Sequence, residues 1–306
     1  MNTDVLQKKL IELVDLASES GIEISGELDQ LENIIRQSTR TDNAWKNVEL
    51  APHPKRPYSM DYIKRIFTGF TELHGDRTFG DDPAIIGGLA FLDNRPVTII
   101  ANQKGRSLEE RVMRNGGMAG PEGYRKALRL AKQAEKFRRP IISFVDTVGA
   151  YPGLGAEERG IGESIARNLR DFSQLKTPII CVITGEGGSG GALGICVGDK
   201  VYMLENAIYS VISPEGCASI LLRDSGRARD AAAMLRISSS DLMAFNVING
   251  IIGEPPGGAH MDPQACAQSI KQVLLEDIAE LSKHSPEILV RYRNQKIRTI
   301  GHWKEN

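Results

Sequence analysis

A glycine-rich turn is the first place in this sequence where chemistry is expected. The turn is Gly185-Glu186-Gly187-Gly188-Ser189-Gly190-Gly191, and it follows a β-branched apolar stretch that predicts a strand over Pro178–Thr184. Glycines there allow backbone N–H groups to approach a ligand closely, and the start of a helix adds partial positive charge. The 185–191 turn therefore suits a phosphate group or a developing oxyanion.

A second loop, Asp146-Thr147-Val148-Gly149-Ala150-Tyr151-Pro152-Gly153-Leu154-Gly155, follows a strand that is predicted over Pro140–Val145. Like the 185–191 turn, this 146–155 loop comes after the carboxyl end of a strand and before a helix. Ligand sites of α/β sheets usually lie at such positions.

The 185–191 turn fits a dinucleotide-binding fingerprint, Gly185-x-Gly187-x-x-Gly190. Glu205 lies about 20 residues further on, where a ribose-binding acid is expected. Against this interpretation, glycines at 194 and 198 interrupt the following helix, and no second mononucleotide-binding half is evident.

The same residues also fit a nucleophile elbow, Gly187-x-Ser189-x-Gly191, with Ser189 as the nucleophile. A serine hydrolase needs a later histidine, and His260, His284 and His302 have no distinctive setting. A third interpretation is an oxyanion hole made of the Gly190 and Gly191 amides, and a fourth is a plain packing turn. The residues of the turn alone leave these four alternatives open.

The surrounding elements predict an α/β domain with a largely parallel sheet, because short apolar strands alternate with helices. The C-terminal third is mainly helical, with a long amphipathic stretch from Asp262 to about Arg293 and a possible break near Ser285-Pro286. The predicted strands are Ala84–Leu92, Val97–Ala101, Pro140–Val145, Pro178–Thr184, Lys200–Leu204 and Ile208–Ile212, and the predicted helices between them are Pro121–Lys136, Ala156–Leu175 and Gly191–Val197.

The N-terminal region has a different pattern. Leucines and isoleucines at helical spacing over the first 40 or so residues predict a helical hairpin with one apolar stripe. A connector rich in proline follows, after which Ser59 is expected to cap a helix that ends at about Leu73. We expect residues 1–48 to be a helical extension and residues 49–306 to be the main domain.

Composition excludes several classes of protein. The net charge is −1, which gives no general attraction to nucleic acid or anionic membranes, and no apolar run is long enough to span a bilayer. The N-terminus lacks the features of a signal peptide, so a cytoplasmic location is expected. The four cysteines form no C-x-x-C pair, which argues against a zinc site in this chain and favours buried free thiols: Cys181, Cys196, Cys217 and Cys266.

The predicted helix over Pro121–Lys136 and its exit are strongly basic. The positive side chains either contact phosphate groups of a ligand or an acidic partner, or simply form a solvated face. Nucleic-acid binding is disfavoured because no aromatic residues are interleaved. The residues are Arg125, Lys126, Arg129, Lys132, Lys136, Arg138 and Arg139.

Six motifs in order resemble one family. Together they are similar to the alpha subunits of acetyl-CoA carboxylase carboxyltransferases, over about Trp45 to Pro263 and more loosely in the N-terminal helices. The motifs are Gln103–Arg106, Pro121–Leu130, Gly149–Gly153, Gly155–Gly160, Gly185–Ala192 and Ser210–Ala218.

The resemblance implies a fold and an activity. The fold is a crotonase-like (ClpP/crotonase) spiral of ββα units, and the activity is transfer of a carboxyl group from carboxybiotin to acetyl-CoA, giving malonyl-CoA. The implied partners are a homologous beta subunit in an alpha2beta2 assembly, the biotin carboxyl carrier protein and biotin carboxylase. No cofactor is implied to be bound covalently to this chain, and zinc is implied only in the beta subunit.

The resemblance also implies site residues. Gly190 and Gly191 would donate their backbone amides to the carbonyl oxygen of carboxybiotin. Two groups of residues would contact substrate: Gly149, Ala150 and Tyr151 in the 146–155 loop, and Gly187, Gly188 and Ser189 in the 185–191 turn.

Two alternatives accompany this interpretation. One is another acyl-CoA enzyme of the same fold, such as a hydratase, although Leu193 stands where its second acid is expected and leaves Glu186 alone. The other is the nucleotide-binding oxidoreductase.

The sequence departs from the family pattern at Val148, where proline is usual, at Gly117 and Gly120, and over Arg223–Arg229.

Overall fold

The computed structural model describes residues 41, 42 and 44–301. The chain divides into two compact units, Met1–Lys46 with Pro214–Arg236, and Asn47–Ser213 with Ile237–Asn306. The predicted helical hairpin lies outside the described residues, and the predicted division at residues 48 and 49 stays a prediction.

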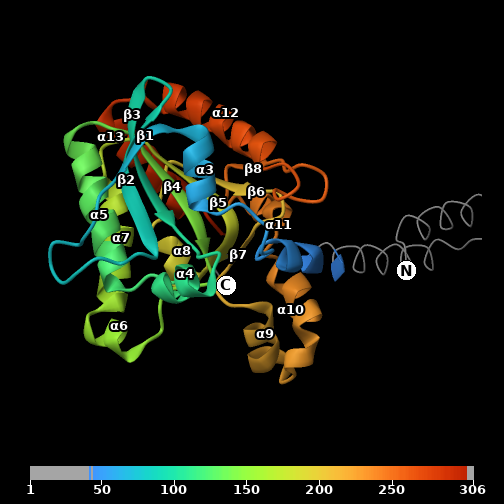
Figure 1. Cartoon of the computed structure of the whole chain (residues 1–306). Coiled ribbons are helices and arrows are strands. Elements are labelled where there is room, and N and C mark those ends of the chain that lie inside the picture. The colour runs from blue at the N-terminus through green and yellow to red at the C-terminus, as the bar shows by residue number, and fades with distance from the viewer. Residues whose placement is uncertain (1–40, 43, 302–306) are drawn as a thin grey trace, which may run out of the picture. The chain divides into compact units, whose positions relative to one another are not determined.

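The unit formed by Asn47–Ser213 and Ile237–Asn306 is built on an eight-stranded sheet (Figure 1). Its strand order is β1-β2-β3-β4-β5-β6-β8, with β7 beside β5; β1 to β3 are antiparallel, and the pairs from β3 onward are parallel. The strands are β1 Thr68–Glu72, β2 Ile85–Leu92, β3 Arg95–Asn102, β4 Ile141–Thr147, β5 Ile179–Gly188, β6 Lys200–Leu204, β7 Ile208–Ser210 and β8 Gly250–Ile252.

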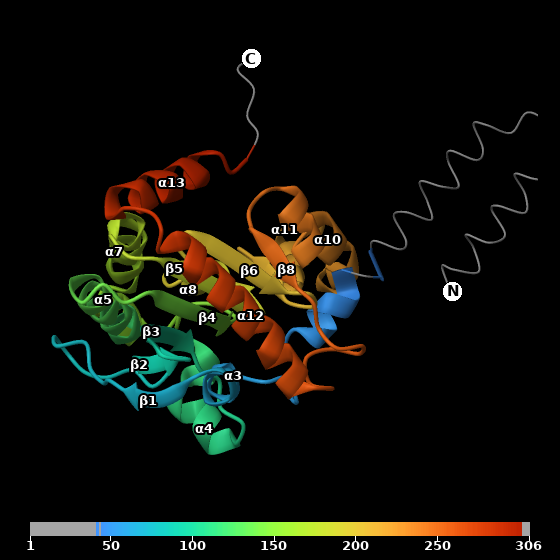
Figure 2. The same cartoon turned by 90° about the horizontal axis from the view of Figure 1, so that it is seen from above.

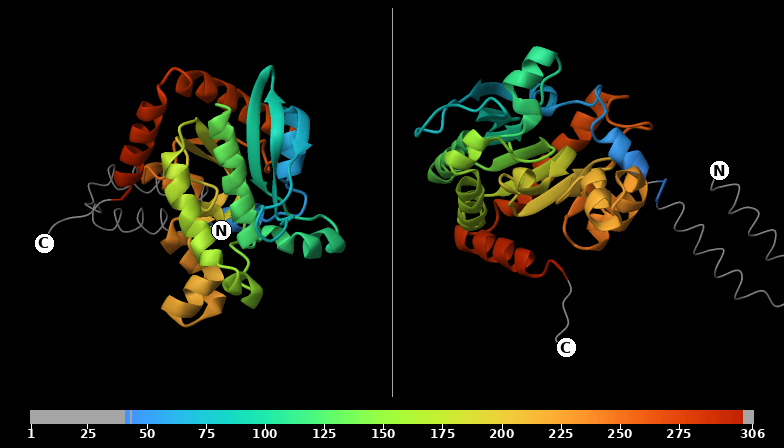
Figure 3. Two further views of the ribbon diagram at one scale, coloured as in Figure 1. Left: turned by 90° about the vertical axis from the view of Figure 1, so that its left-hand side faces the viewer. Right: turned by 90° about the horizontal axis from the view of Figure 1, so that it is seen from below.

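Helices cover both faces of this sheet. The two longest on one side, α5 and α7, lie next to each other, and α12 lies across the region of β6 and β8 (Figures 2 and 3). The helices of this unit are α3 Ser59–Ile66, α4 Leu108–Met113, α5 Pro121–Lys136, α6 Leu154–Glu158, α7 Ile161–Gln174, α8 Ser189–Leu193, α11 Ser239–Ala244, α12 Pro263–Leu281 and α13 Pro286–Arg298, with a 3-10 turn at Asn115–Gly117.

Strand β4 shows how the layers form. All of its residues are buried, as expected for a parallel strand between two helical layers. Neighbouring side chains of a strand point to opposite faces. The Phe144 ring stacks on Tyr62 of α3, with ring centroids 6.2 Å apart, whereas the Ser143 hydroxyl donates to the Ile195 carbonyl at 2.6 Å. Helix α3 and the segment after α8 therefore cover opposite faces.

Most predicted elements are confirmed within one to four residues, and α5 and β6 have the predicted bounds. The predicted helix from Ser59 to about Leu73 is wrong, since α3 ends at Ile66 and β1 follows. Tyr58, rather than Ser59, precedes the first helical residue, and its N–H donates to the Asp61 carboxylate at 2.9 Å.

Two other predicted helices have different bounds. The predicted helix over Ala156–Leu175 is divided into α6 and α7 at Gly160, whose φ of 80° no side-chain-bearing residue adopts readily. Helix α8 begins at Ser189, two residues before the predicted start, and is only 5 residues long. The predicted break between the last two helices is confirmed by α12 and α13.

At the amino ends of the parallel strands, a buried arginine joins α13 to the sheet. The Arg293 side chain donates to both carboxylate oxygens of Asp199, at 2.9 and 2.8 Å, in front of β6. It also donates to the carbonyl oxygens of Phe172 and Leu175, both at 2.8 Å, and of Thr177 at 2.9 Å. The Nε and both terminal nitrogens of the Arg293 guanidinium group thus all have acceptors.

The unit that contains Pro214–Arg236 is described by itself. It holds α9 Pro214–Cys217, a π-helical turn at Ala218–Leu222, a 3-10 turn at Ser225–Arg227 and α10 Ala228–Leu235. The Arg229 guanidinium lies 3.9 Å from the Asp42 carboxylate and 5.9 Å from the centre of the Trp45 ring. The atypical stretch Arg223–Arg229 is the short connection before and into α10.

All four cysteines of the chain are free and buried, as predicted.

Candidate active site

The 146–155 loop and the 185–191 turn lie backbone against backbone at the carboxyl ends of β4 and β5. A Cβ atom on Gly188 would lie 2.0 Å from the Val148 carbonyl oxygen, and one on Gly191 would lie 2.2 Å from the Gly149 carbonyl carbon. Neither position can hold a side chain unless the facing loop moves. The structure therefore brings the predicted residues Gly149 and Ala150 next to the predicted residues of the turn.

The amides of Gly190 and Gly191 are neighbouring donors in the first turn of α8. Ser189 precedes them with a left-handed φ of 48°, which turns the chain sharply out of β5. The first N–H groups of a helix have no acceptor within it. Among the described residues, neither amide donates to an acceptor elsewhere in the chain, so both remain able to bond a ligand.

Side chains of α5 and α7 fix the position of α8. The Tyr124 hydroxyl donates to the Gly191 carbonyl at 3.2 Å, and the Asn168 side chain donates to the Gly194 carbonyl at 2.8 Å. Asn168 also donates to the Tyr124 carbonyl at 3.0 Å, and both side chains are buried. The sequence singled out Tyr124 only as part of a family motif, and Asn168 was missed altogether.

A largely buried ion cluster joins both loops to the segment after β3. Lys104 Nζ lies 2.7 Å from an Asp146 carboxylate oxygen and 2.6 Å from one of Glu186. Asp146 also accepts the Glu186 backbone N–H at 3.0 Å. Burial acts to lower the pKa of Lys104, but the two carboxylates outweigh it and raise this pKa above its usual value. The Lys104 cluster, Lys104 with Asp146 and Glu186, thus holds the start of the 185–191 turn against the 146–155 loop.

Two departures from the family pattern fit this arrangement. Gly117 has a φ of 89°, and a Cβ there would lie 2.9 Å from Cγ of Lys104. Its lack of a side chain therefore leaves space for the lysine. The Gly120 N–H donates to the Asp82 carboxylate at 2.6 Å, which anchors the start of α5.

The rim of the site is exposed and apolar. Val148 is 53% exposed, Leu154 is 76% exposed and Tyr151 is 37% exposed. The Tyr151 backbone N–H donates to the Ala119 carbonyl at 2.9 Å, so the loop is fixed while the ring faces outward. Of the predicted substrate-binding residues, Tyr151 is thus the one that lies at the rim. Exposed apolar groups beside polar ones are typical of interaction sites.

The geometry disfavours the rival chemistries. Within the described residues no histidine bonds to Ser189: His260 stacks on His53 with ring centroids 4.0 Å apart, and His284 packs against Tyr292. His302 lies outside the described residues. For a dinucleotide, α8 is too short to be the usual binding helix, and Glu205 accepts the Glu254 N–H instead. For a hydratase, Glu186 is bound to Lys104.

The basic side chains of α5 and its exit largely serve the protein itself. Lys126 is fully buried and lies 2.5 Å from the Asp81 carboxylate, and Arg125 lies 2.7 Å from that of Asp76. Arg129 donates to two backbone carbonyls of the loop before β2, and Lys132 pairs with Asp171 at 2.7 Å. These four cations are therefore committed to neighbouring groups.

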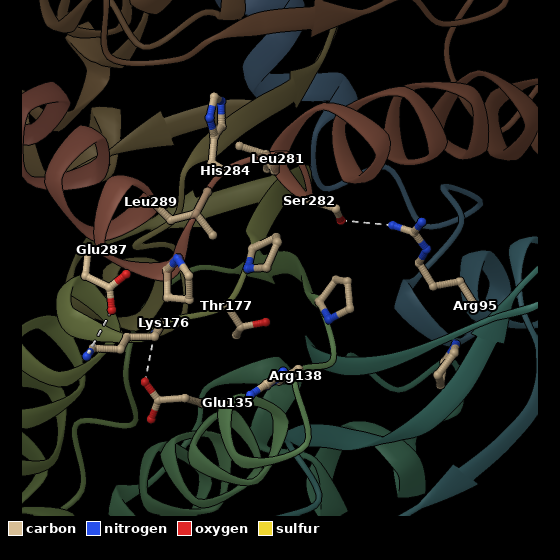
Figure 4. A pocket seen from close by; sticks show the side chains of 14 residues that line it. Arg95, Glu135, Arg138, Lys176, Thr177, Leu281, Ser282, His284, Glu287 and Leu289 are labelled. Carbon is tan, nitrogen blue, oxygen red and sulfur yellow. Dashed lines mark hydrogen bonds and ion pairs between the residues drawn. The ribbon is translucent and has the colours of Figure 1, made fainter.

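A cavity of about 760 Å³ lies at the opposite, amino edge of the strands (Figure 4). In its lining, Arg95 donates to the Ser282 hydroxyl at 3.0 Å, and Lys176 lies 3.5 Å from the Glu287 carboxylate. None of the predicted site residues lines it.

Over residues 41, 42 and 44–301, no three His, Cys, Asp or Glu side chains are grouped so that they could hold a metal ion. No helix in the same part of the chain is both long and apolar enough to cross a membrane.

Comparison with known proteins identifies the family. Residues 2–301 match the family model described as acetyl co-enzyme A carboxylase carboxyltransferase-like. The chain belongs to this family.

Curated relatives agree over nearly the full length. The acetyl-coenzyme A carboxylase carboxyl transferase subunit alpha of Treponema denticola is 65% identical over 293 residues, which is 96% of each chain. The protein of the same name from Halorhodospira halophila is 51% identical over 300 residues, which is 97% of this chain and 94% of that one.

Solved structures of carboxyltransferases and decarboxylases share the fold. A Pseudomonas malonate decarboxylase hetero-tetramer in complex with coenzyme A contains a chain that is 16% identical with a TM-score of 0.59, over 72% of this chain and 90% of that one. Transcarboxylase 12S is 21% identical with a TM-score of 0.57, over 71% of this chain, and this chain spans 41% of the transcarboxylase chain. The predicted crotonase-like fold of ββα units is confirmed.

Proposed function

We propose that this chain is the alpha subunit of the carboxyltransferase of acetyl-CoA carboxylase. With a beta subunit it transfers the carboxyl group of carboxybiotin, which is carried on the biotin carboxyl carrier protein, to acetyl-CoA. The product is malonyl-CoA, and the reaction is the first committed step of fatty acid biosynthesis. The relatives that match the chain over nearly its whole length have this name, which supports the proposal.

The observation that carries the proposal is the pair of unbonded amides at Gly190 and Gly191. Release of CO2 from carboxybiotin leaves negative charge on the ureido oxygen. Two donors that are already in place stabilise such a charge without reorganisation, and losing one donor of this kind costs about 10²–10³ in rate. Tyr124 and the Lys104 cluster keep these donors in position.

The proton transfer needs no basic side chain from this chain. As the N–CO2 bond of carboxybiotin breaks, its electron pair stays on the ureido group, and the ureido nitrogen then takes a proton from the acetyl methyl group. The resulting enolate carbon attacks CO2 and forms the new C–C bond. Glu186, the nearest carboxylate in the turn, is the ion partner of Lys104 and is not available as a base.

The site described so far is half of what the reaction requires. The enolate oxygen of the thioester needs donors of its own, and we propose that the beta subunit supplies them from an equivalent turn in an alpha2beta2 assembly. The exposed apolar rim at Val148, Tyr151 and Leu154 is suited to being covered by substrate and partner. Zinc is expected in the beta subunit alone. Biotin carboxylase is expected as a further partner, and the complex is expected in the cytoplasm.

Reconstitution tests this function. The chain is assayed for malonyl-CoA formation alone, with the beta subunit, and with the beta subunit plus biotin or its carrier as the carboxyl donor. Product is expected only when both the beta subunit and the carboxylated donor are present. Formation of malonyl-CoA by the chain alone would contradict the shared site. Saturable NAD binding, or labelling of Ser189 by a fluorophosphonate, would favour the rival oxidoreductase or hydrolase.

A further inference from the structure

A second cavity, of about 540 Å³, lies beside α8 in the same unit. Volumes of this size, with mostly apolar walls and a few polar groups, are typical of small-molecule sites. The apolar side chains come from α7, α8 and the segment after it, β6, the turn before β8, and α13. The main ones are Leu169, Leu193, Val197, Val201, Val247 and Ile297.

Lys296 is the single charged side chain among the described residues that line this pocket. Its Nζ donates to the Asn249 side-chain oxygen at 2.5 Å and lies 3.4 Å from the Asp199 carbonyl oxygen, and both acceptors are neutral. No carboxylate of the described residues pairs with it, because the Asp199 carboxylate is bound on both oxygens by Arg293.

The Lys296 side chain is half-buried, and its bond to the exposed Asn249 lies at the mouth of the pocket. Burial lowers the pKa of Lys296, although the nearby Asp199 acts in the opposite direction. Charged groups that are removed from water are normally paired. The pocket thus combines an apolar volume with one ammonium group that has hydrogen bonds but no counter-ion among the described residues.

We propose that this pocket binds an amphiphilic monocarboxylate, with its hydrocarbon tail among the apolar side chains and its carboxylate on Lys296. A phosphate group fits less well, because one lysine beside apolar walls cannot replace the hydration of a dianion. A bound tail would contact Leu193, which lies in α8 two residues after Gly191. The ligand would therefore rest against the helix that carries the two donor amides.

Calorimetric titration of the full chain tests this site without any assay of carboxyl transfer. The probes are decanoate, decanol and butyrate, each below its aggregation concentration. Saturable binding of decanoate is expected, with decanol and butyrate at least tenfold weaker, since one lacks the charge and the other the tail.

Substitutions identify the pocket. Lys296→Met is expected to weaken decanoate binding at least tenfold and to leave decanol binding unchanged, whereas Lys296→Arg keeps most of the affinity. Lys200→Met is the matched control, because Lys200 pairs with Glu280 at 3.5 Å and does not line the pocket. The proposal is overturned if the folded wild-type chain does not bind decanoate saturably, or if Lys296→Met binds it as tightly as the wild type. Neither result would affect the proposed carboxyl transfer.

Discussion

The two edges of the parallel sheet differ in how their polar groups are satisfied. At the amino edge, Arg293 bonds to Asp199 and to three backbone carbonyls, and Lys176 pairs with Glu287 in the neighbouring cavity. At the carboxyl edge, the Lys104 cluster is also closely bonded, but the amides of Gly190 and Gly191 have no acceptor among the described residues.

This difference separates structural polar groups from functional ones. The first N–H groups of a helix have no acceptor within it, and at α8 the described residues supply none from outside for Gly190 or Gly191. At the carboxyl edge, the side-chain hydrogen bonds position the 185–191 turn, and the Gly190 and Gly191 amides are left without a partner among the described residues. We therefore expect substitutions at the two edges to have similar effects on stability and very different effects on turnover.

The largest loss of turnover is expected from Gly191→Ala. Its Cβ would lie 2.2 Å from the Gly149 carbonyl carbon, so the 146–155 loop and the 185–191 turn must separate. With both donors displaced, turnover in the reconstituted complex should fall by at least about 10³. The matched control is Gly162→Ala in α7, where a Cβ meets nothing within 4 Å and activity should not change. Retention of more than a tenth of the activity by Gly191→Ala would show that the close approach of the loops is not needed.

The next prediction compares the edges directly. Lys104→Met leaves the carboxylates of Asp146 and Glu186 without a cation, and Arg293→Met leaves that of Asp199 without one. Removing one partner of a buried pair costs about 3–5 kcal/mol, so chemical denaturation should show a comparable loss of stability in both variants. Turnover per folded complex should fall at least tenfold for Lys104→Met alone. An equal loss of turnover in the Arg293 variant would remove the distinction between the edges.

A smaller effect is expected from Tyr124→Phe. The change removes the hydrogen bond to the Gly191 carbonyl at 3.2 Å and leaves a buried acceptor, which costs about 1–2 kcal/mol in stability. Because the donors themselves remain, kcat should fall by about fivefold and KM should change little. Steady-state kinetics with acetyl-CoA measures both constants. A raised KM with unchanged kcat would instead indicate that Tyr124 acts on substrate binding.

The smallest effect on turnover is expected from Asp76→Asn, which alters a loop bound to α5 and not the 185–191 turn. Burial acts to raise the pKa of Asp76, but the N–H groups of Thr78, Phe79 and Gly80 and the Arg125 side chain outweigh it and bring this pKa to about 2. A lowered pKa stabilises the fold above the usual carboxyl range, and that contribution is lost as the pH falls from about 4 to 2.

Thermal denaturation at several pH values checks this last prediction. Asp76→Asn should be about 2 kcal/mol less stable than the wild type at pH 7, because the carboxylate is buried and its lowered pKa corresponds to a stabilisation of that size. The difference should disappear near pH 2, and kcat at pH 7 should be nearly unchanged. A stability difference that persists at pH 2 would mean that the Asp76 charge is not its source.

The sequence predicted the elements that carry the site because their patterns are local. Pro121 at the start of α5 and the β-branched run of β5 were enough to place both within a few residues. The helix predicted after Ser59 ends early because the β-branched and aromatic residues of 67–71 favour a strand there. Gly69, with a φ of 62°, lies at a register shift of that strand.

The contacts that hold the turn could not be predicted in the same way. Tyr124 is 67 residues from Gly191, and Lys104 is 82 residues from Glu186, so no local pattern joins them. The four interpretations of the 185–191 turn differ only in what surrounds Ser189, Gly190 and Gly191. The fold distinguishes the interpretations, because the described histidines do not bond to Ser189 and both amides lack an acceptor among the described residues.

The most direct test of the account compares Gly190→Pro with Gly190→Ala in the reconstituted complex. Proline removes the amide donor at a position in the first helical turn where it breaks no helical hydrogen bond, whereas an alanine Cβ meets Ile165 at an ordinary 3.5 Å and keeps the donor. We predict that the proline variant assembles with the beta subunit but loses at least about 10² in kcat. The alanine variant should stay within a few-fold of the wild type. Full turnover in an assembled Gly190→Pro complex would contradict the role of this amide.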